Sequence, residues 1–127
     1  MKVLLSIKPE FAEKIFEGTK KYEFRRTIFK NPDVKTVVVY ASSPVQKVIG
    51  EFEVDCILTD DLEKIWQETE KFAGIDKSYF MSYFNKKEHA YAIKVKKTKR
   101  YKKLLNLKES FGINPPQSFA YIEEANS

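Results

Sequence analysis

The hydrophobic period near the N-terminus changes from strand to helix and back to strand, and this change constrains the possible folds more than any other feature. Lys2–Ile7 has the apolar character of a strand. A proline in the first turn then opens a segment with apolar residues at helical spacing, and Gly18 follows at the position of a left-handed cap, so a helix is predicted over Pro9–Glu17. Tyr22 and Phe24 next alternate with charged residues, which is typical of a half-buried strand.

The rest of the chain continues to mix strand and helix patterns. Further strands are predicted over Thr36–Ala41, 47–59, 89–101 and 118–122, a short amphipathic piece over 104–111, and two helices capped by Asp60 or Asp61 and by Asp76. The strand over 47–59 should bend at Gly50, and the strand over 89–101 should project beyond its sheet. These elements predict an α+β domain built on a small β-barrel, with a short first helix and an inserted helical pair.

Length and residue types narrow the class of protein. A chain of 127 residues suits one hydrophobic core, so we expect a single domain over residues 1–127. Cys56, the only cysteine, has apolar neighbours and is expected to be a buried thiol in a reducing compartment. Without a signal peptide or a run of about 18 apolar residues, we expect a cytoplasmic protein with no membrane contact. His89, the only histidine, has no partner at ligand spacing, so neither a metal nor a cofactor is expected.

Charge is distributed unevenly along the chain, whose net charge is +5. The range 94–103 carries seven cations and no acid, whereas the range 51–76 carries nine acids against two lysines, a net charge of −7. Because basic segments attract polyanions and acidic segments repel them, we expect a nucleic acid to approach from the side of 94–103. Tyr101, inside that basic run, can stack on a base or pack as an edge-strand aromatic.

Four residues around the end of the predicted helix form the candidate site. Glu23 and Arg25 are two apart on a strand, so they share a face, with about 6.5 to 7 Å between their Cα atoms. Gly18 allows a sharp turn that brings the ammonium of Lys20 within reach of the same face. Such a trio can grip a phosphate or a base edge, and a desolvated lysine can act as a base. The alternative is a structural Glu23–Arg25 ion pair that closes the barrel, with Lys20 as a solvated turn residue.

These residues belong to the segment SIKPEFAEKIFEGTKKYEFRR (6–26), in which Gly18, Lys20, Glu23 and Arg25 meet the spacing G-x-K-x-x-E-x-R. The segment resembles the opening of ASCH domains, in particular the small stand-alone proteins of prokaryotes, and the resemblance extends to VVVYASSP (37–44) and PPQSFAYI (115–122). ASCH domains look like members of the PUA-like superfamily. The resemblance therefore implies a PUA-like small β-barrel with a cleft for RNA or a nucleotide.

The resemblance and the charge pattern together define the candidate residues. Lys20 and Glu23 are the candidate catalytic residues. The candidate nucleic-acid contacts are Lys8, Gly18, Lys20, Glu23, Arg25, Ser42, Ser43, Lys94, Lys96, Lys97, Lys99, Arg100, Gln117 and Ser118. For the serines and the glutamine, which only the resemblance implies, the alternative is ordinary turn chemistry.

Three functions remain open at this stage. The first is an RNA- or nucleotide-binding module in RNA metabolism or in the regulation of translation or transcription. The resemblance also brings in ribonucleases and hydrolases of acylated cytidine. In those hydrolases the motif lysine works with a threonine, where this chain has Glu23, and with a downstream glutamate, for which Glu63, Glu68 and Glu70 are candidates. The third is a DNA-binding regulator, although no helix-turn-helix recognition helix stands out. The oligomeric state stays open.

Overall fold

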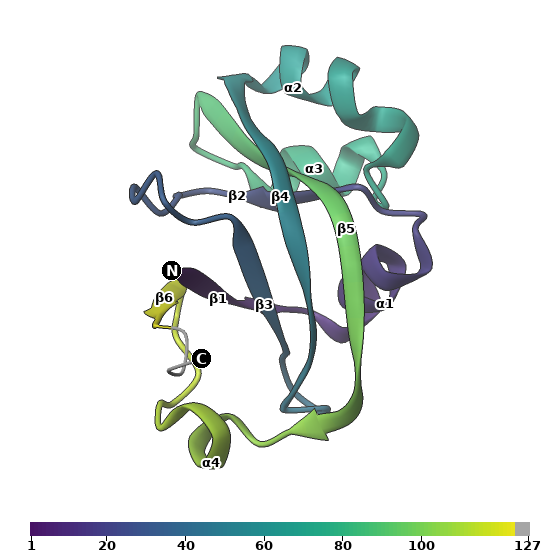
Figure 1. Cartoon of the computed structure of the whole chain (residues 1–127). Coiled ribbons are helices and arrows are strands. Elements are labelled where there is room, and N and C mark those ends of the chain that lie inside the picture. The colour runs from purple at the N-terminus through teal and green to yellow at the C-terminus, as the bar shows by residue number, and fades with distance from the viewer. Residues whose placement is uncertain (124–127) are drawn as a thin grey trace.

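The fold is a mixed six-stranded sheet with helices packed around it (Figure 1), seen in a computed structural model that describes residues 1–123. The strands are β1 (Lys2–Ile7), β2 (Tyr22–Arg25), β3 (Thr36–Ala41), β4 (Lys47–Asp61), β5 (His89–Leu105) and β6 (Phe119–Ile122), in the spatial order β2-β5-β4-β3-β1-β6. The helical elements are α1 (Pro9–Glu17), α2 (Leu62–Thr69), the 3-10 turn η1 (Glu70–Phe72), α3 (Lys77–Tyr83) and α4 (Leu107–Phe111). The predicted α+β class is confirmed. Within residues 1–123 no helix combines the length and apolar character needed to cross a bilayer.

The most apolar strands lie where both faces of the sheet are covered. β1 pairs in parallel with β3 and antiparallel with β6. On one face, Val3 and Leu5 belong to the same core as Ile15 of α1, and on the other face Leu4 packs with Leu107 of α4. Burial on both sides explains why these strands read as continuous apolar runs and do not alternate.

The predicted helical insert is formed by α2, η1 and α3, which lie between β4 and β5 in the chain and cover the upper end of the sheet in Figure 1. Asp61 caps α2 and Asp76 caps α3, each side chain accepting from the backbone N–H three residues later, at 2.9 and 2.8 Å. The insert packs on β2, with the ring centres of Phe80 and Phe24 5.1 Å apart. This contact fixes the insert to the strand that carries the motif.

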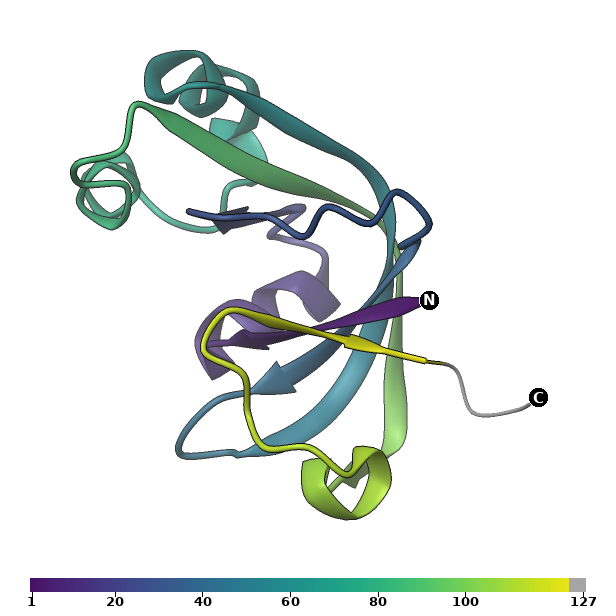
Figure 2. The same cartoon turned by 90° about the vertical axis from the view of Figure 1, so that its left-hand side faces the viewer.

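The sheet is not closed into a continuous barrel, which corrects the expected architecture. Among the described residues β2 pairs only with β5, and β6 only with β1. In side view the sheet curls into a C, and α1 lies in its opening (Figure 2). One side chain takes the place of a closing backbone ladder. Arg25, at the end of β2, donates from Nη2 to the carbonyl of Ser118, just before β6, at 2.7 Å, and from Nη1 to the carbonyl of Ser6 in β1 at 3.3 Å.

Two expectations for β4 and β5 are wrong. Cys56 is exposed, because the register shifts between Val54 and Cys56 and such a shift turns later side chains to the other face. The basic strand does not project beyond the sheet, because β4 is long enough for β5 to pair with it as far as Leu105. A further register shift lies at Gly50, where the bend is predicted.

Candidate functional site

A pocket of about 230 Å³ lies between β2, the start of α1 and α3, and we call it the β2 pocket. Its walls combine cations, one carboxylate and aromatic rings, which are contributed by segments far apart in the sequence. The lining residues are Ser6, Ile7, Lys8, Phe11, Lys20, Glu23, Phe24, Arg25, Ile75, Tyr79, Tyr83 and Gln117. The structure thus brings the three charged residues of the motif to one cavity.

Lys20 is buried at the inner side of this pocket, with 2% of its surface exposed, which excludes the alternative of a solvated turn residue. Gly18 ends α1 in the left-handed conformation (φ 91°) and turns the chain inward, as predicted. The ammonium donates to the carbonyl of Ala73 and lies 4.7 and 5.3 Å from the ring centres of Phe24 and Phe11. Burial lowers the pKa of Lys20 to about 8, and the nearby Glu23 opposes that change.

Glu23 and Arg25 share a face of β2 and form an ion pair, Nη1 to Oε2, at 3.3 Å. The Glu23 side chain is buried, and this burial raises the pKa of its carboxyl, with Arg25 and Lys20 acting in the opposite direction. The predicted shared face is confirmed. The ion pair of the structural alternative is also present, so Arg25 both lines the pocket and joins β2 to the opposite arm of the sheet.

The aromatic wall of the pocket is a feature that the sequence reasoning missed. Tyr79 and Tyr83 of α3 face the cavity, and the ring of Tyr79 meets that of Phe11 edge to face at 5.4 Å. Lys8 at the rim donates to the Tyr79 hydroxyl at 3.1 Å, and this hydrogen bond raises the pKa of Lys8. The four-residue spacing of the two tyrosines, one position before the buried Phe80 and Phe84, is the signal that marks a second aromatic face on this helix.

Of the other candidates near the ends of strands and helices, one lines the pocket and the others do not. Gln117 lines it, and Ser118 contributes the carbonyl that accepts from Arg25. Ser42 follows β3, where its backbone N–H bonds the carbonyl of Ile7, and neither it nor Ser43 lines the pocket. Gly18 acts through the turn and does not line the cavity.

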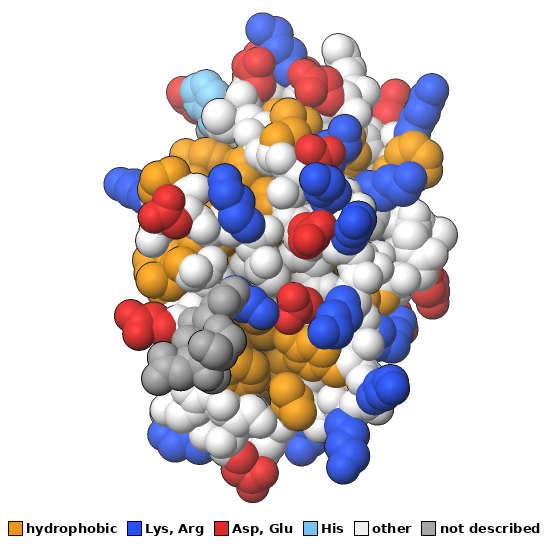
Figure 3. Space-filling model, in the orientation of Figure 1, with side chains coloured by type: hydrophobic (Ala, Val, Ile, Leu, Met, Phe, Trp, Pro, Cys, Tyr) orange, Lys and Arg blue, Asp and Glu red, His pale blue; other side chains and the backbone are white. Residues whose placement is uncertain are grey.

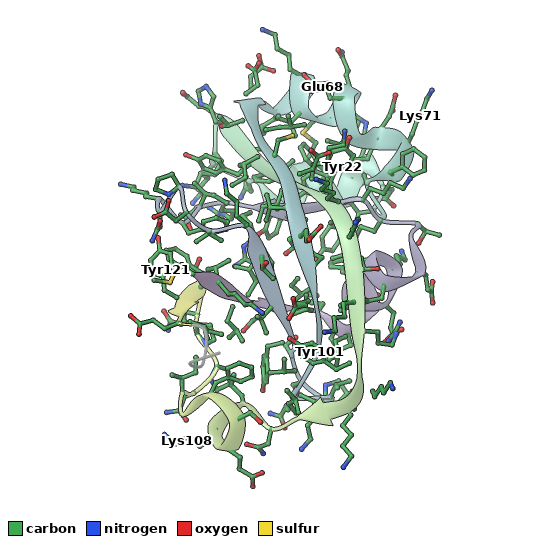
Figure 4. The ribbon with its side chains drawn as sticks, in the orientation of Figure 1. Tyr22, Glu68, Lys71, Tyr101, Lys108 and Tyr121 are labelled. Atoms are coloured by element: carbon green, nitrogen blue, oxygen red, sulfur yellow. The ribbon has the colours of Figure 1, made fainter. Side chains whose placement is uncertain are left out.

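The glutamates considered as partners of Lys20 do not reach the pocket. Glu63 pairs with Lys77 at 3.2 Å, and Glu68 projects from the outer side of the insert (Figure 4). Glu70 is exposed on η1 and also does not line the pocket. The insert turns its apolar side to β2 and its acidic side to the solvent. Within residues 1–123, the carboxylate whose charge acts on Lys20 is therefore that of Glu23.

The basic run 94–103 does not join the pocket either. Lys94, Lys96, Lys97, Lys99 and Arg100 lie along β5, where Figure 3 shows blue side chains over that strand interspersed with acidic ones. Part of this charge is paired: Arg100 binds both carboxylate oxygens of Glu13 at 3.0 and 2.9 Å, and Lys94 lies 3.7 Å from Asp55.

Tyr101, which Figure 4 places on the lower half of β5, is partly buried on the sheet. Its hydroxyl donates to Glu51 at 2.7 Å, and burial together with this hydrogen bond raises the pKa of the phenol. The alternative of a packed aromatic therefore describes Tyr101, although β5 lies inside the strand order and is not an edge strand.

The turn that holds Lys20 gives a test of its packing. Gly74 has φ 70°, and an added Cβ would lie 2.6 to 2.8 Å from the Cβ, Cγ and Cδ atoms of Lys20. Gly74→Ala should therefore destabilise the fold by about 2–5 kcal/mol, the sum of left-handed strain and overpacking. Gly112→Ala is the matched control, because Gly112 has the same φ of 70° and no atom within 4 Å of the added Cβ. Equal losses for the two variants in urea unfolding would show that the Lys20 stem is not confined.

The ASCH domain family model matches residues 5–99, which include the second half of β1, β2 to β4, the insert and most of β5. The chain belongs to the ASCH domain family. The resemblance carried by the motif segment is confirmed at the level of the family.

The chain is similar in sequence to one ASCH protein of Zymomonas mobilis and similar in fold to a crystal structure from the same organism. This ASCH chain is 30% identical over 124 residues to an ASCH domain-containing ribonuclease of Zymomonas mobilis, covering 95% of this chain and 84% of that protein. The crystal structure of ASCH from Zymomonas mobilis has a TM-score of 0.88 and 30% identity, covering 97% of this chain and 88% of that one. The chain is also 32% identical over 123 residues to a Ureaplasma parvum protein named ATP synthase subunit alpha, of which it spans only 15%.

Proposed function

We propose that this ASCH domain binds RNA and takes one unpaired nucleotide into the β2 pocket. The observation that carries the proposal is the convergence of Lys8, Lys20 and Arg25 with a single carboxylate and an aromatic wall in one cavity. Cations contact phosphates or base edges, and aromatic rings stack on bases. The Zymomonas mobilis relative, named a ribonuclease, supports RNA as the partner.

The position of each residue in the β2 pocket, at the rim or at the inner end, indicates which part of the nucleotide it contacts. A volume of about 230 Å³ is below the roughly 300–1,000 Å³ of drug-sized pockets and suits a single base with its sugar. Lys8 and Tyr79 at the exposed rim meet the phosphate and the face of the base. Lys20 and Glu23, both buried, meet polar atoms on the base edge, and Arg25 holds Glu23 in position.

Tyr79→Ala tests the aromatic wall. Loss of one stacking ring should weaken binding of single-stranded RNA about 5- to 150-fold, because base–aromatic stacking contributes about 1–3 kcal/mol. Binding is measured by fluorescence anisotropy over a salt series, with hairpin RNA and duplex DNA as competitors. Phe72→Ala is the control, because Phe72 is an exposed aromatic of the same insert outside the pocket. Wild-type protein without salt-dependent affinity for any RNA would refute the proposal, and stronger competition by duplex DNA would favour a DNA-binding regulator.

RNA cleavage is a second candidate function, favoured by the lowered pKa of Lys20 next to a carboxyl with a raised pKa. A neutral Lys20 amine accepts the proton of a ribose 2′-hydroxyl, whose oxygen then attacks the adjacent phosphorus. The bond from phosphorus to the 5′-oxygen breaks, and the leaving oxygen takes its proton from water, while the Glu23 carboxylate stays paired with Arg25. Lys8 and Arg25 offset the negative charge that builds up on the phosphate.

A further inference from the structure

A second groove lies beyond the end of β2, and we call it the loop groove. It encloses about 430 Å³ between the loop that follows β2 and the loop that joins α3 to β5. Its lining residues are Arg26, Thr27, Ile28, Lys30, Lys86, Lys87, Glu88, His89 and Tyr91. Four cations thus face one carboxylate in a concave surface, an arrangement that concentrates positive potential.

The cations of the loop groove take part in no ion pair within residues 1–123, whereas two of the cations of β5 do. Within residues 1–123, Arg26, Lys30, Lys86 and Lys87 have no carboxylate within 4.0 Å, whereas Arg100 and Lys94 on β5 are paired with Glu13 and Asp55. Arg26 is held by a bond from its Nη2 to the carbonyl of Asn85 at 3.3 Å. This bond joins the two loops that form the groove.

The loop groove follows the β2 pocket along the chain on two of its walls, and the two cavities have no lining residue in common. Arg25 lines the pocket and Arg26 lines the groove, and consecutive Cα atoms are only about 3.8 Å apart. On the opposite wall Tyr83 lines the pocket, and Asn85, two residues later, binds Arg26. Adjoining nucleotides of one strand can therefore occupy the two sites at the same time.

Lys86 has an unusual backbone for a lysine. Its φ is 68°, in the left-handed region that asparagine and glycine adopt more readily. The cation thus occupies a position where glycine or asparagine would be less strained. A lysine held there against its backbone preference is consistent with a use for its side chain.

From the charge, the closeness of the groove to the pocket along the chain and the strained lysine, we infer that the loop groove binds the phosphates that flank the nucleotide held in the β2 pocket. This inference rests on the proposed function and deepens it, because it assigns a path to the RNA backbone. The path crosses the loops after β2 and α3, and β5 is not its main contact. Lys86 and Lys87 bind phosphate oxygens from one side, and Arg26 and Lys30 bind them from the other.

The experiment compares two double variants of the full chain that remove the same charge. Lys86→Asn with Lys87→Gln removes two cations of the loop groove, and asparagine suits the left-handed φ. Lys96→Gln with Lys97→Gln removes two exposed cations of β5 that take part in no ion pair within residues 1–123. The probe is a short, fluorescently labelled, mixed-sequence single-stranded RNA. Each contact with a single-strand phosphate contributes about 0.7 to the slope of log K against log salt.

We expect the loop-groove variant to lower the magnitude of this slope by about 1.4, for two phosphate contacts, and the β5 variant to leave it unchanged. A slope lowered by the β5 variant alone, or equally by both variants, would overturn the inference. The proposed function fails separately, when wild-type protein does not bind the RNA. If Tyr79→Ala weakens binding and the loop-groove variant does not, the pocket proposal stands and the backbone path is wrong.

Discussion

Replacing Arg25 with methionine should destabilise the fold by about 3–5 kcal/mol, the usual cost of removing one partner from a buried ion pair. The substitution leaves the enclosed Glu23 carboxylate without its partner at 3.3 Å. It also removes the two hydrogen bonds to the carbonyls of Ser6 and Ser118 that tie β2 to the opposite arm of the sheet. Urea unfolding at neutral pH measures the loss.

The pH dependence of the lost stability shows whether it comes from the broken ion pair or from lost packing contacts. Because the pKa of Glu23 is raised in the fold, the folded state binds more protons than the unfolded state just above pH 4.5, and stability falls as the pH rises through that window. Without Arg25 this pKa should rise further, so the defect of the variant should shrink on acidification. Arg25→Met combined with Glu23→Gln should recover part of the stability at neutral pH. A defect independent of pH, with no recovery in the double variant, would show that the ion pair is not the cause.

Replacing Lys20 with methionine should reduce RNA cleavage by about 10²- to 10⁴-fold, the range typical of a lost general base. Only the neutral amine accepts a proton, so cleavage by the wild-type protein should rise with pH and level off above about pH 8. The measurement is the single-turnover rate on labelled single-stranded RNA across this pH range.

Two further variants show whether Lys20 acts as a general base or only contacts a phosphate. Lys20→Arg keeps the cation but cannot lose its proton near neutral pH, so binding should persist while cleavage is lost. Lys21→Met, at the exposed neighbouring lysine, should leave both unchanged. Cleavage that is unaffected in Lys20→Met would exclude Lys20 as the base. RNA binding that weakens above pH 8 without any cleavage would make Lys20 a phosphate contact, and turnover of N4-acetylcytidine in its place would indicate an amidohydrolase.

The burial of Lys20 has a readout that does not depend on RNA. The pKa of Lys20 is about 8 in the folded protein, and its ordinary value, which applies to the unfolded chain, is 10.5. Between pH 8 and pH 10.5 the unfolded state therefore binds more protons than the folded state. Stability should therefore rise with pH across this window in the wild-type protein. The rise should be absent from Lys20→Met, which carries no titrating amine.

The local elements of this fold could be predicted because their signals lie within a few residues of each other. A proline in the first turn and a glycine at the cap fix both ends of α1, and Asp61 and Asp76 mark the starts of α2 and α3. Alternation on β2 puts Glu23 and Arg25 on one face without reference to any other segment.

The contacts that complete the site depend on segments that meet only in the folded chain. The carbonyl of Ala73 that accepts from Lys20 comes from the insert, 53 residues later in the sequence. The tyrosine wall depends on how α3 docks against β2, and the exposure of Cys56 on a register shift that the alternation of residue types does not reveal. Hydrophobic patterning determines which side of an element is buried, but it does not identify the element that covers it.

The guanidinium that spans the two arms of the C-shaped sheet affects how relatives of this chain should be compared. Because the hydrogen bonds of Arg25 to the carbonyls of Ser6 and Ser118 join the two arms whatever the pocket holds, a relative can lose the ligand and still keep the motif. A motif search therefore recovers proteins that share an architecture and does not by itself sort them by substrate. Lys8 and Tyr79 at the rim span no such gap, so their presence in a relative is the better marker of a shared ligand.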